Sequence, residues 1–206
     1  MNYNEFQKIM SSYPVFSVRE IEKQFPGFDK RRLVEWQEKG YIQKLRNRFY
    51  CFSDIKTTEP FLYYVANMLY HPSYISLETA LARYGFIPEG VFQILSCSTL
   101  KTQTFDTLRG IFVYRNIKSK LFFGYTLEQW EDRHYAIAEP EKTLIDYLYL
   151  HAEVQTISDI EALRWNTVAI NERISLKKLH MYQSYIASQA LDRRLLLLKE
   201  VLHVKA

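Results

Sequence analysis

The chain has 206 residues, 48% of them hydrophobic, so it can bury one large core or two small ones, as a folded globular protein does. Its formal net charge of +4 is too small to identify a nucleic-acid-binding protein by bulk charge alone. No stretch approaches the ~18 apolar residues of a membrane-spanning helix, and the first residues lack the apolar core of a signal peptide. We therefore expect no membrane partner and a cytoplasmic location.

Residues 3–12 predict an amphipathic helix, whose apolar face carries Phe6, Ile9 and Met10. The spacing Ser17-x-x-Glu20 is that of a capping box, and it predicts a second short helix that ends before Pro26. Pro26 and Gly27 then favour a tight turn. Together these residues predict the first two helices of a small domain.

A third helix follows the turn, with Asp29 as its expected N-cap and Gly40 just beyond its end at Lys39. Leu33 and Trp36 lie on one side of it, so the opposite, charged side is left free. From residue 19 to residue 48 the chain carries nine basic and five acidic residues, and the difference equals the net charge of the whole chain. The positive charge is therefore concentrated around this helix.

The runs Ile42 to Leu45 and Phe49 to Cys51 predict a hairpin with Arg46-Asn47-Arg48 at its turn. A helix, turn, helix and hairpin in this order predict a winged helix-turn-helix over residues 1–53 that binds double-stranded DNA. The residues expected to contact DNA are Ser17, Lys30, Arg31, Arg32, Glu35, Lys39, Arg46, Asn47 and Arg48. Arg31 is the expected base reader, because it faces away from the apolar side. A charged helix face is also typical of plain solvated surface, and this fold also serves protein contacts.

Residues 54–60 are polar, end in proline and predict a linker to a second domain at 61–206. Residues 61–70 are apolar nearly all round, which favours a helix buried between the two domains or against a partner. Ser76 is the expected cap of a helix from Leu77 to Tyr84. The expected strands of a small sheet are 91–98, 111–115 and 134–138. Beyond them we expect a helix with Pro140 in its first turn, a capping box Ser158-x-x-Glu161 and a helical tail to residue 206, so the fold class is α+β.

Cys51 and Cys97 form no CxxC pair, which indicates two buried thiols in a reducing compartment. The histidines are scattered, so no metal, cofactor or enzymatic activity is expected. Glu141 and Asp146 beside a lysine could form a nuclease or acid–base site. They are five residues apart and point in different directions on a helix, and Glu141 and Lys142 suit its solvated first turn, so a structural role is favoured. A DNA-processing enzyme is the least favoured alternative.

The stretches YISLETALARYGFIP and AIAEPEKTLIDYLYL resemble the AbiEi family, the transcriptional-regulator antitoxins of bacterial type IV toxin–antitoxin and phage-defence systems. The positions that match its S-x-x-x-A-L-x-x-x-G and A-x-P-E-[RK]-T-x-x-D motifs are Ser76, Ala80, Leu81, Gly85, Ala138, Pro140, Glu141, Lys142, Thr143 and Asp146. The resemblance implies a repressor of its own operon whose second domain counteracts a nucleotidyltransferase-like toxin, directly or functionally. Toxin neutralisation would then be separable from DNA binding. Such regulators also occur without a toxin, so a plain winged-helix regulator remains the alternative.

Overall fold

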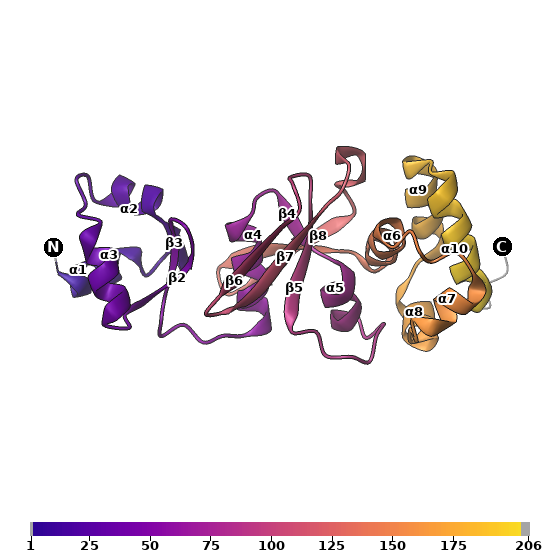
Figure 1. Cartoon of the computed structure of the whole chain (residues 1–206), viewed down its shortest axis with the longest axis horizontal. Coiled ribbons are helices and arrows are strands. Elements are labelled where there is room, and N and C mark those ends of the chain that lie inside the picture. The colour runs from indigo at the N-terminus through magenta and orange to yellow at the C-terminus, as the bar shows by residue number, and fades with distance from the viewer. Residues whose placement is uncertain (1, 203–206) are drawn as a thin grey trace.

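The computed structural model describes residues 2–202 and has an elongated shape (Figure 1). A unit of helices with a three-stranded sheet lies at one end, and a six-stranded sheet lies in the middle. Helices near the C-terminus form the other end. The class is mixed α+β, as the sequence predicts, but the second sheet is larger than the small sheet expected.

The N-terminal unit contains α1 (Tyr3–Met10), β1 (Val15–Ser17), α2 (Val18–Gln24), α3 (Arg31–Glu38), β2 (Ile42–Arg46) and β3 (Phe49–Phe52). Its strands are antiparallel in the order β1-β3-β2, and β1 is absent from the sequence prediction. The capping box of α2 is confirmed, because the backbone N–H of Ser17 donates to Glu20 at 2.6 Å and the Ser17 hydroxyl accepts from Glu20 N–H at 3.3 Å. The expected N-cap of α3 is wrong by one residue. Lys30 occupies that position, and Asp29 accepts from Arg31 N–H instead.

An aromatic core holds this unit together. Phe6 from α1 lies 4.5 Å from Trp36 of α3 and 5.6 Å from Phe16 of β1, measured between ring centroids. Leu33 is buried beside Trp36, as the helical pattern predicts. Ile9 is 46% exposed, so only Phe6 and Met10 of the predicted apolar face of α1 are buried. Burial of the Leu33 side of α3 leaves its other side in solvent.

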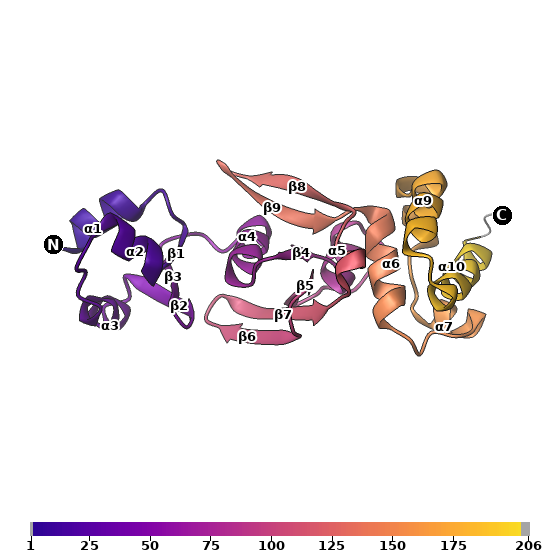
Figure 2. The ribbon, with the colours of Figure 1, turned by 90° about the horizontal axis from the view of Figure 1, so that it is seen from above.

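The middle unit begins with α4 (Glu59–Leu69), which is buried as predicted and includes the last two residues of the predicted linker. The remaining elements up to the last strand are β4 (Ser73–Ile75), α5 (Leu77–Arg83), β5 (Gln93–Ser98), β6 (Gln103–Thr107), β7 (Gly110–Asn116), η1 (Ser119–Leu121), β8 (Tyr125–Trp130) and β9 (Arg133–Ala138). The strand order is β6-β7-β5-β4-β9-β8, with β5–β7 and β4–β9 parallel. The sequence predicts strands β5, β7 and β9 but does not predict β4, β6 and β8. Helix α4 covers one face of the sheet, and α5 with α6 covers the other (Figure 2).

The C-terminal region contains α6 (Pro140–Leu150), α7 (Ile157–Ala162), α8 (Thr167–Arg173), α9 (Leu176–Ile186) and α10 (Gln189–Val201). The capping box of α7 uses Thr156 and Asp159, so the predicted Ser158 and Glu161 pair is wrong. The tail is also not one continuous run. Arg164 and Ala187 have left-handed backbone conformations that separate helices, with φ of 52° and 51°. The last four residues of the predicted tail lie outside the described residues.

The segment between the first two units is held in place by one side chain. The guanidinium of Arg109, in the β6–β7 turn, donates to the carbonyl oxygens of Phe52, Ser53 and Ile55 and to the hydroxyl of Thr57, at 2.6 to 3.0 Å. Val15, Leu45 and Cys51 also belong to the apolar cluster built around α4 and the larger sheet. The two units therefore share part of an apolar cluster.

Candidate nucleic-acid interface

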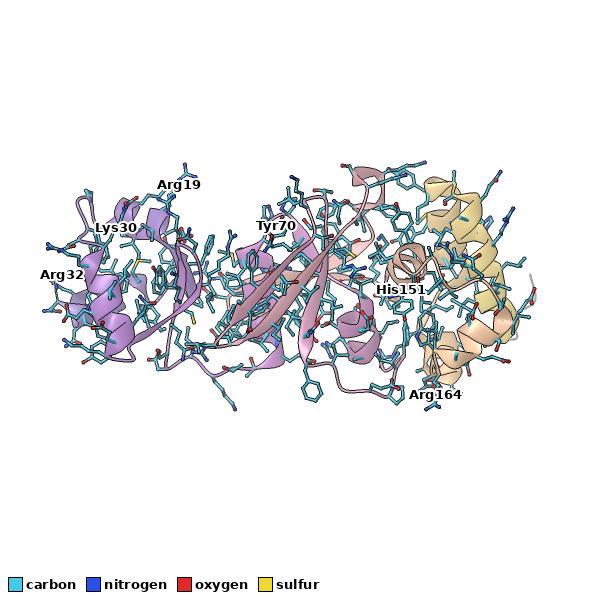
Figure 3. All side chains as sticks on the ribbon, in the orientation of Figure 1. Arg19, Lys30, Arg32, Tyr70, His151 and Arg164 are labelled. Carbon is cyan, nitrogen blue, oxygen red and sulfur yellow. The ribbon has the colours of Figure 1, made fainter. Side chains whose placement is uncertain are left out.

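Helix α3 presents a solvent-exposed face at the end of the molecule farthest from the six-stranded sheet. Figure 3 shows Arg32 projecting from this end and Arg19 projecting from α2. The side chain of Arg31 is 91% exposed. Val34 is also exposed, at 57%, although it was not among the residues singled out from the sequence. An exposed valine on a charged helix face is the signal that could have identified it.

Most of the predicted contact residues of α3 pair with carboxylates. Lys30 lies 2.7 Å from Glu22, and Lys39 lies 2.6 Å from Glu35. The Nε and Nη2 of Arg31 donate to both oxygens of Asp29, at 2.8 to 3.1 Å. The Lys30 and Arg31 partners lower the pKa of the Glu22 and Asp29 carboxyls. Among the described residues, Arg32 has no carboxylate within salt-bridge distance.

The predicted hairpin tip is shorter than the sequence suggests. Arg46 is the last residue of β2 and pairs with Phe49 across the hairpin, so the turn contains only Asn47 and Arg48. The guanidinium carbon of Arg46 lies 4.6 Å from the ring centroid of Phe49 and 4.9 Å from that of Phe105 in β6. Burial lowers the pKa of Arg46. Arg46 therefore joins the two units, and the expectation that it projects from the tip is wrong.

Asn47 and Arg48 are exposed. Arg48 has a φ of 67°, and its carbonyl oxygen accepts from Val18 N–H at 2.9 Å, so the tip lies against the start of α2. Ser17 is half-buried and caps α2 with its side-chain oxygen. The tip, the start of α2 and the exposed face of α3 thus belong to one unit. Arg46 is the one predicted contact residue that packs into the middle of the molecule.

A buried polar cluster contains three of the motif residues. Ser76 occupies the N-cap position of α5, but its hydroxyl makes no capping bond and donates to Asp146 at 2.8 Å. Tyr74 also donates to Asp146, at 2.9 Å, and accepts from the Lys142 ammonium at 2.7 Å. Lys142 forms an ion pair with Asp146, and both side chains are fully buried. This cluster ties β4 and α5 to α6 and is closed to solvent.

The expectation that Glu141 and Lys142 lie on a solvated helix turn is wrong. Glu141 is 3% exposed and Lys142 is fully buried. A carboxylate oxygen of Glu141 accepts from the backbone N–H of Ser175, the N-cap residue of α9, at 2.6 Å. Glu141 thus fastens α9 to α6, while Asp146 takes different partners. Glu141 and Asp146 therefore do not converge on one site.

The remaining motif residues lie at helix ends or in the core. Gly85 has a φ of 72° just beyond α5, where Phe86 N–H donates to Leu81 at 2.8 Å, and this left-handed conformation favours glycine. Pro140 is the first residue of α6, and the Thr143 hydroxyl donates to the carbonyl oxygen of Glu139 at 3.0 Å. The fully buried apolar motif residues are Ala80, Leu81 and Ala138. These positions are structural in this chain.

Residues 2–202 contain no group of three or more side chains that could hold a metal ion. No helix within that range has the length and apolar character needed to cross a membrane. No protein-family model matches the chain, and no curated protein matches it either.

Proposed function

We propose that the chain is a DNA-binding transcriptional regulator whose N-terminal unit acts as a winged helix-turn-helix. The observation that carries this proposal is the order α2, turn, α3 and β2–β3 hairpin, with α3 packed through Leu33 and Trp36 and open to solvent on its other side. A recognition helix lies in the major groove and contacts base edges through its first residues. In α3 those residues are Arg31, Arg32 and Val34.

The contacts within α3 suggest a role for each of these side chains. Arg32 has no described ion-pair partner, so it is free to bond the N7 and O6 of a guanine. Val34 offers an apolar contact of the kind that recognises a thymine methyl group. To contact DNA, Arg31 has to break its ion pair with Asp29. This costs little free energy, because ion pairs in solvent contribute little to stability. Arg32 needs no such exchange of partners, so we propose it as a base reader beside Arg31.

The hairpin tip is the second part of the chain proposed to contact DNA. Arg48 is exposed there, and an arginine on a turn suits a phosphate or the minor groove. Arg46 is left out of the proposed contact, because its guanidinium packs on the rings of Phe49 and Phe105. The proposed interface then comprises α3, the tip and the N-terminus of α2. Contacts to phosphates position the protein, and contacts to bases specify the sequence.

The resemblance of residues 76–146 to the AbiEi family supports a more specific role. In this role the chain represses its own operon, and residues 61–206 counteract a nucleotidyltransferase-like toxin. A plain winged-helix regulator without a toxin is the alternative. The adjacent gene distinguishes them: co-expression of a toxic neighbour with this chain should restore growth, whereas a neighbour without toxicity would favour the alternative.

The test of DNA binding is fluorescence anisotropy with the DNA upstream of the coding sequence, in competition with scrambled DNA of the same length. Arg32→Ala should lower the preference for the natural sequence by about tenfold, the loss expected for one bidentate arginine–guanine contact. Arg173→Ala is the matched control, because Arg173 is exposed on α8 and carries the same charge. Equal affinity of the unaltered protein for both DNAs would refute sequence-specific regulation.

A further inference from the structure

A cavity of about 510 Å³ lies where the middle unit meets the C-terminal helices. Its walls come from α5, the loop before β5, α6 and the segment after α7. The residues that line it are Glu78, Leu81, Ile87, Glu89, Gly90, Val91, Phe92, Gln93, Leu95, Tyr147, Leu163 and Trp165. This volume falls within the range of pockets that hold small molecules. Helices α5 and α6, which contribute to its walls, lie on the opposite side of the six-stranded sheet from the N-terminal unit (Figure 1).

Two aromatic rings form one corner of the cavity. The rings of Tyr147 and Trp165 meet edge to face, with centroids 5.1 Å apart. His151 stacks on Tyr147 at 3.9 Å and fixes the orientation of the ring. Burial and then the Glu78 carboxylate raise the pKa of Tyr147 to about 12, so its phenol stays neutral. A rigid corner of neutral aromatic rings attracts cations through their π faces.

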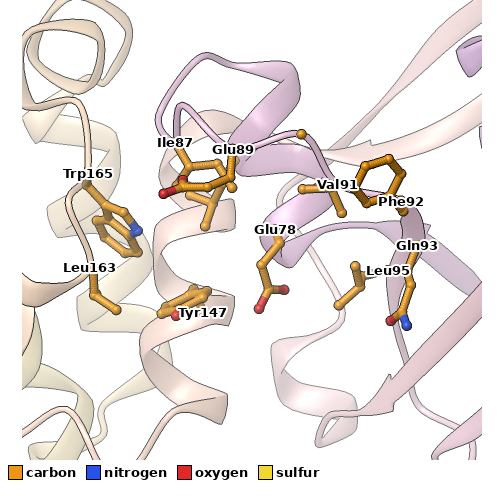
Figure 4. A pocket seen from close by; sticks show the side chains of 12 residues that line it. Glu78, Ile87, Glu89, Val91, Phe92, Gln93, Leu95, Tyr147, Leu163 and Trp165 are labelled. Atoms are coloured by element: carbon orange, nitrogen blue, oxygen red, sulfur yellow. The ribbon is translucent and has the colours of Figure 1, made fainter.

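The charged groups of the lining are all acidic. Glu78 and Glu89 contribute carboxylates, and the lining includes no lysine, arginine or histidine. Figure 4 shows the Glu78 side chain pointing into the space bounded by Tyr147, Leu95 and Ile87. One carboxylate oxygen of Glu78 is inaccessible to solvent and has no hydrogen-bond partner. Because solvent does not reach that oxygen, a ligand in the cavity would meet the negative charge of the Glu78 carboxylate rather than bond this atom.

We propose that this cavity is a binding site for a small organic cation, with an ammonium or guanidinium group beside Glu78 and an apolar body against Tyr147 and Trp165. The acidic lining excludes anions such as nucleotides by repulsion. Phe92, which is 96% exposed, lies at the rim on the other side of Glu78 from Trp165 (Figure 4). The proposal is independent of DNA binding, because the site shares no residue with α3 or the hairpin.

The test uses the full-length protein and three probes, choline, benzyltrimethylammonium and agmatine, titrated to millimolar concentration. Binding is followed through the Trp165 indole signal in ¹H–¹⁵N NMR spectra and by calorimetry. At least one probe should shift the Trp165 signal, and 3,3-dimethylbutan-1-ol, the neutral isostere of choline, should not. Glu78→Gln should weaken binding by about tenfold or more. Glu161→Gln, at an exposed position of α7, should leave the affinity unchanged.

Three results would overturn the proposal. The first is the absence of any Trp165 shift with all three probes while the protein remains folded. The second is equal binding of choline and its neutral isostere, which would indicate a purely apolar pocket. The third is binding of a lysine- or arginine-containing peptide but of none of the small probes, which would assign the cavity to a protein partner instead.

Discussion

Replacing Lys142 with methionine should destabilise the protein strongly, because it leaves a buried carboxylate without its countercharge. In the native protein Asp146 receives hydrogen bonds from Tyr74 and Ser76 in addition to the Lys142 ammonium. Methionine keeps much of the length of the lysine chain, so the cavity it creates is small. The loss is then mainly electrostatic. We expect the free energy of unfolding to fall by about 3–5 kcal/mol, the usual cost of removing one partner of a buried ion pair.

The double variant Lys142→Met/Asp146→Leu distinguishes the contribution of the ion pair to stability from that of the surrounding hydrogen bonds. Removal of both charges eliminates the unpaired carboxylate, and such replacements are often close to neutral in stability. The hydroxyls of Tyr74 and Ser76 then lose their shared acceptor, which costs about 1–3 kcal/mol for each buried group left unpaired. We therefore expect the double variant to be less destabilised than the sum of the two single variants.

The assay is urea unfolding at neutral pH, with circular dichroism as the signal that monitors unfolding. Lys39→Met is the matched control, because Lys39 pairs with Glu35 at the same i,i+4 spacing but their side chains are 52% and 49% exposed. That variant should lose little stability. A loss below about 1 kcal/mol for Lys142→Met, or additive losses in the double variant, would refute the structural role assigned to the motif.

Three further predictions concern other parts of the chain. Arg109→Ala should accelerate tryptic cleavage after Lys56, because it removes the four hydrogen bonds that hold residues 52–57. Arg115→Ala is the control and should leave the cleavage rate unchanged. Equal cleavage rates for the Arg109→Ala variant and the unaltered protein would show that other contacts fix the segment. Burial and the Asp146 carboxylate raise the pKa of the Cys97 thiol. At about pH 8 this thiol should therefore react with a disulfide reagent only after the protein unfolds. Labelling of Cys97 in the native protein would contradict its burial. Arg48→Ala should make the slope of log K for DNA against log salt shallower by about one unit, and an unchanged slope would remove the hairpin tip from the interface.

Sequence reasoning was most successful where a local rule determines structure. The capping box at Ser17, the apolar pattern of residues 61–70 and the proline at the start of α6 all depend on neighbours within a few residues. Gly85 likewise ends α5 through its own backbone conformation. By contrast, β4, β6 and β8 were missed. They are short or largely exposed, so their formation depends on pairing with distant strands rather than on a local apolar pattern.

The same limit applies to the candidate site. Lys142 suits the first turn of a solvated helix by sequence, yet it is buried, where it pairs with Asp146 of the same helix and donates to Tyr74 of β4. Arg46 suits a hairpin tip, yet Phe105, 59 positions later in the sequence, provides the ring that holds it. Both errors concern a charged side chain that is held by a residue from a distant element, Tyr74 for Lys142 and Phe105 for Arg46.

Site-specific photo-cross-linking tests the central claim, that α3 contacts DNA, most directly. A benzophenone amino acid would replace Val34 on α3 or, as a matched control, Val168 on α8, since these valines are 57% and 65% exposed. Irradiation with the DNA upstream of the coding sequence should cross-link the Val34 variant, and scrambled DNA should compete poorly for it. The Val168 variant should remain uncross-linked. Cross-linking from Val168 but not from Val34 would contradict the assignment of α3 as the recognition helix.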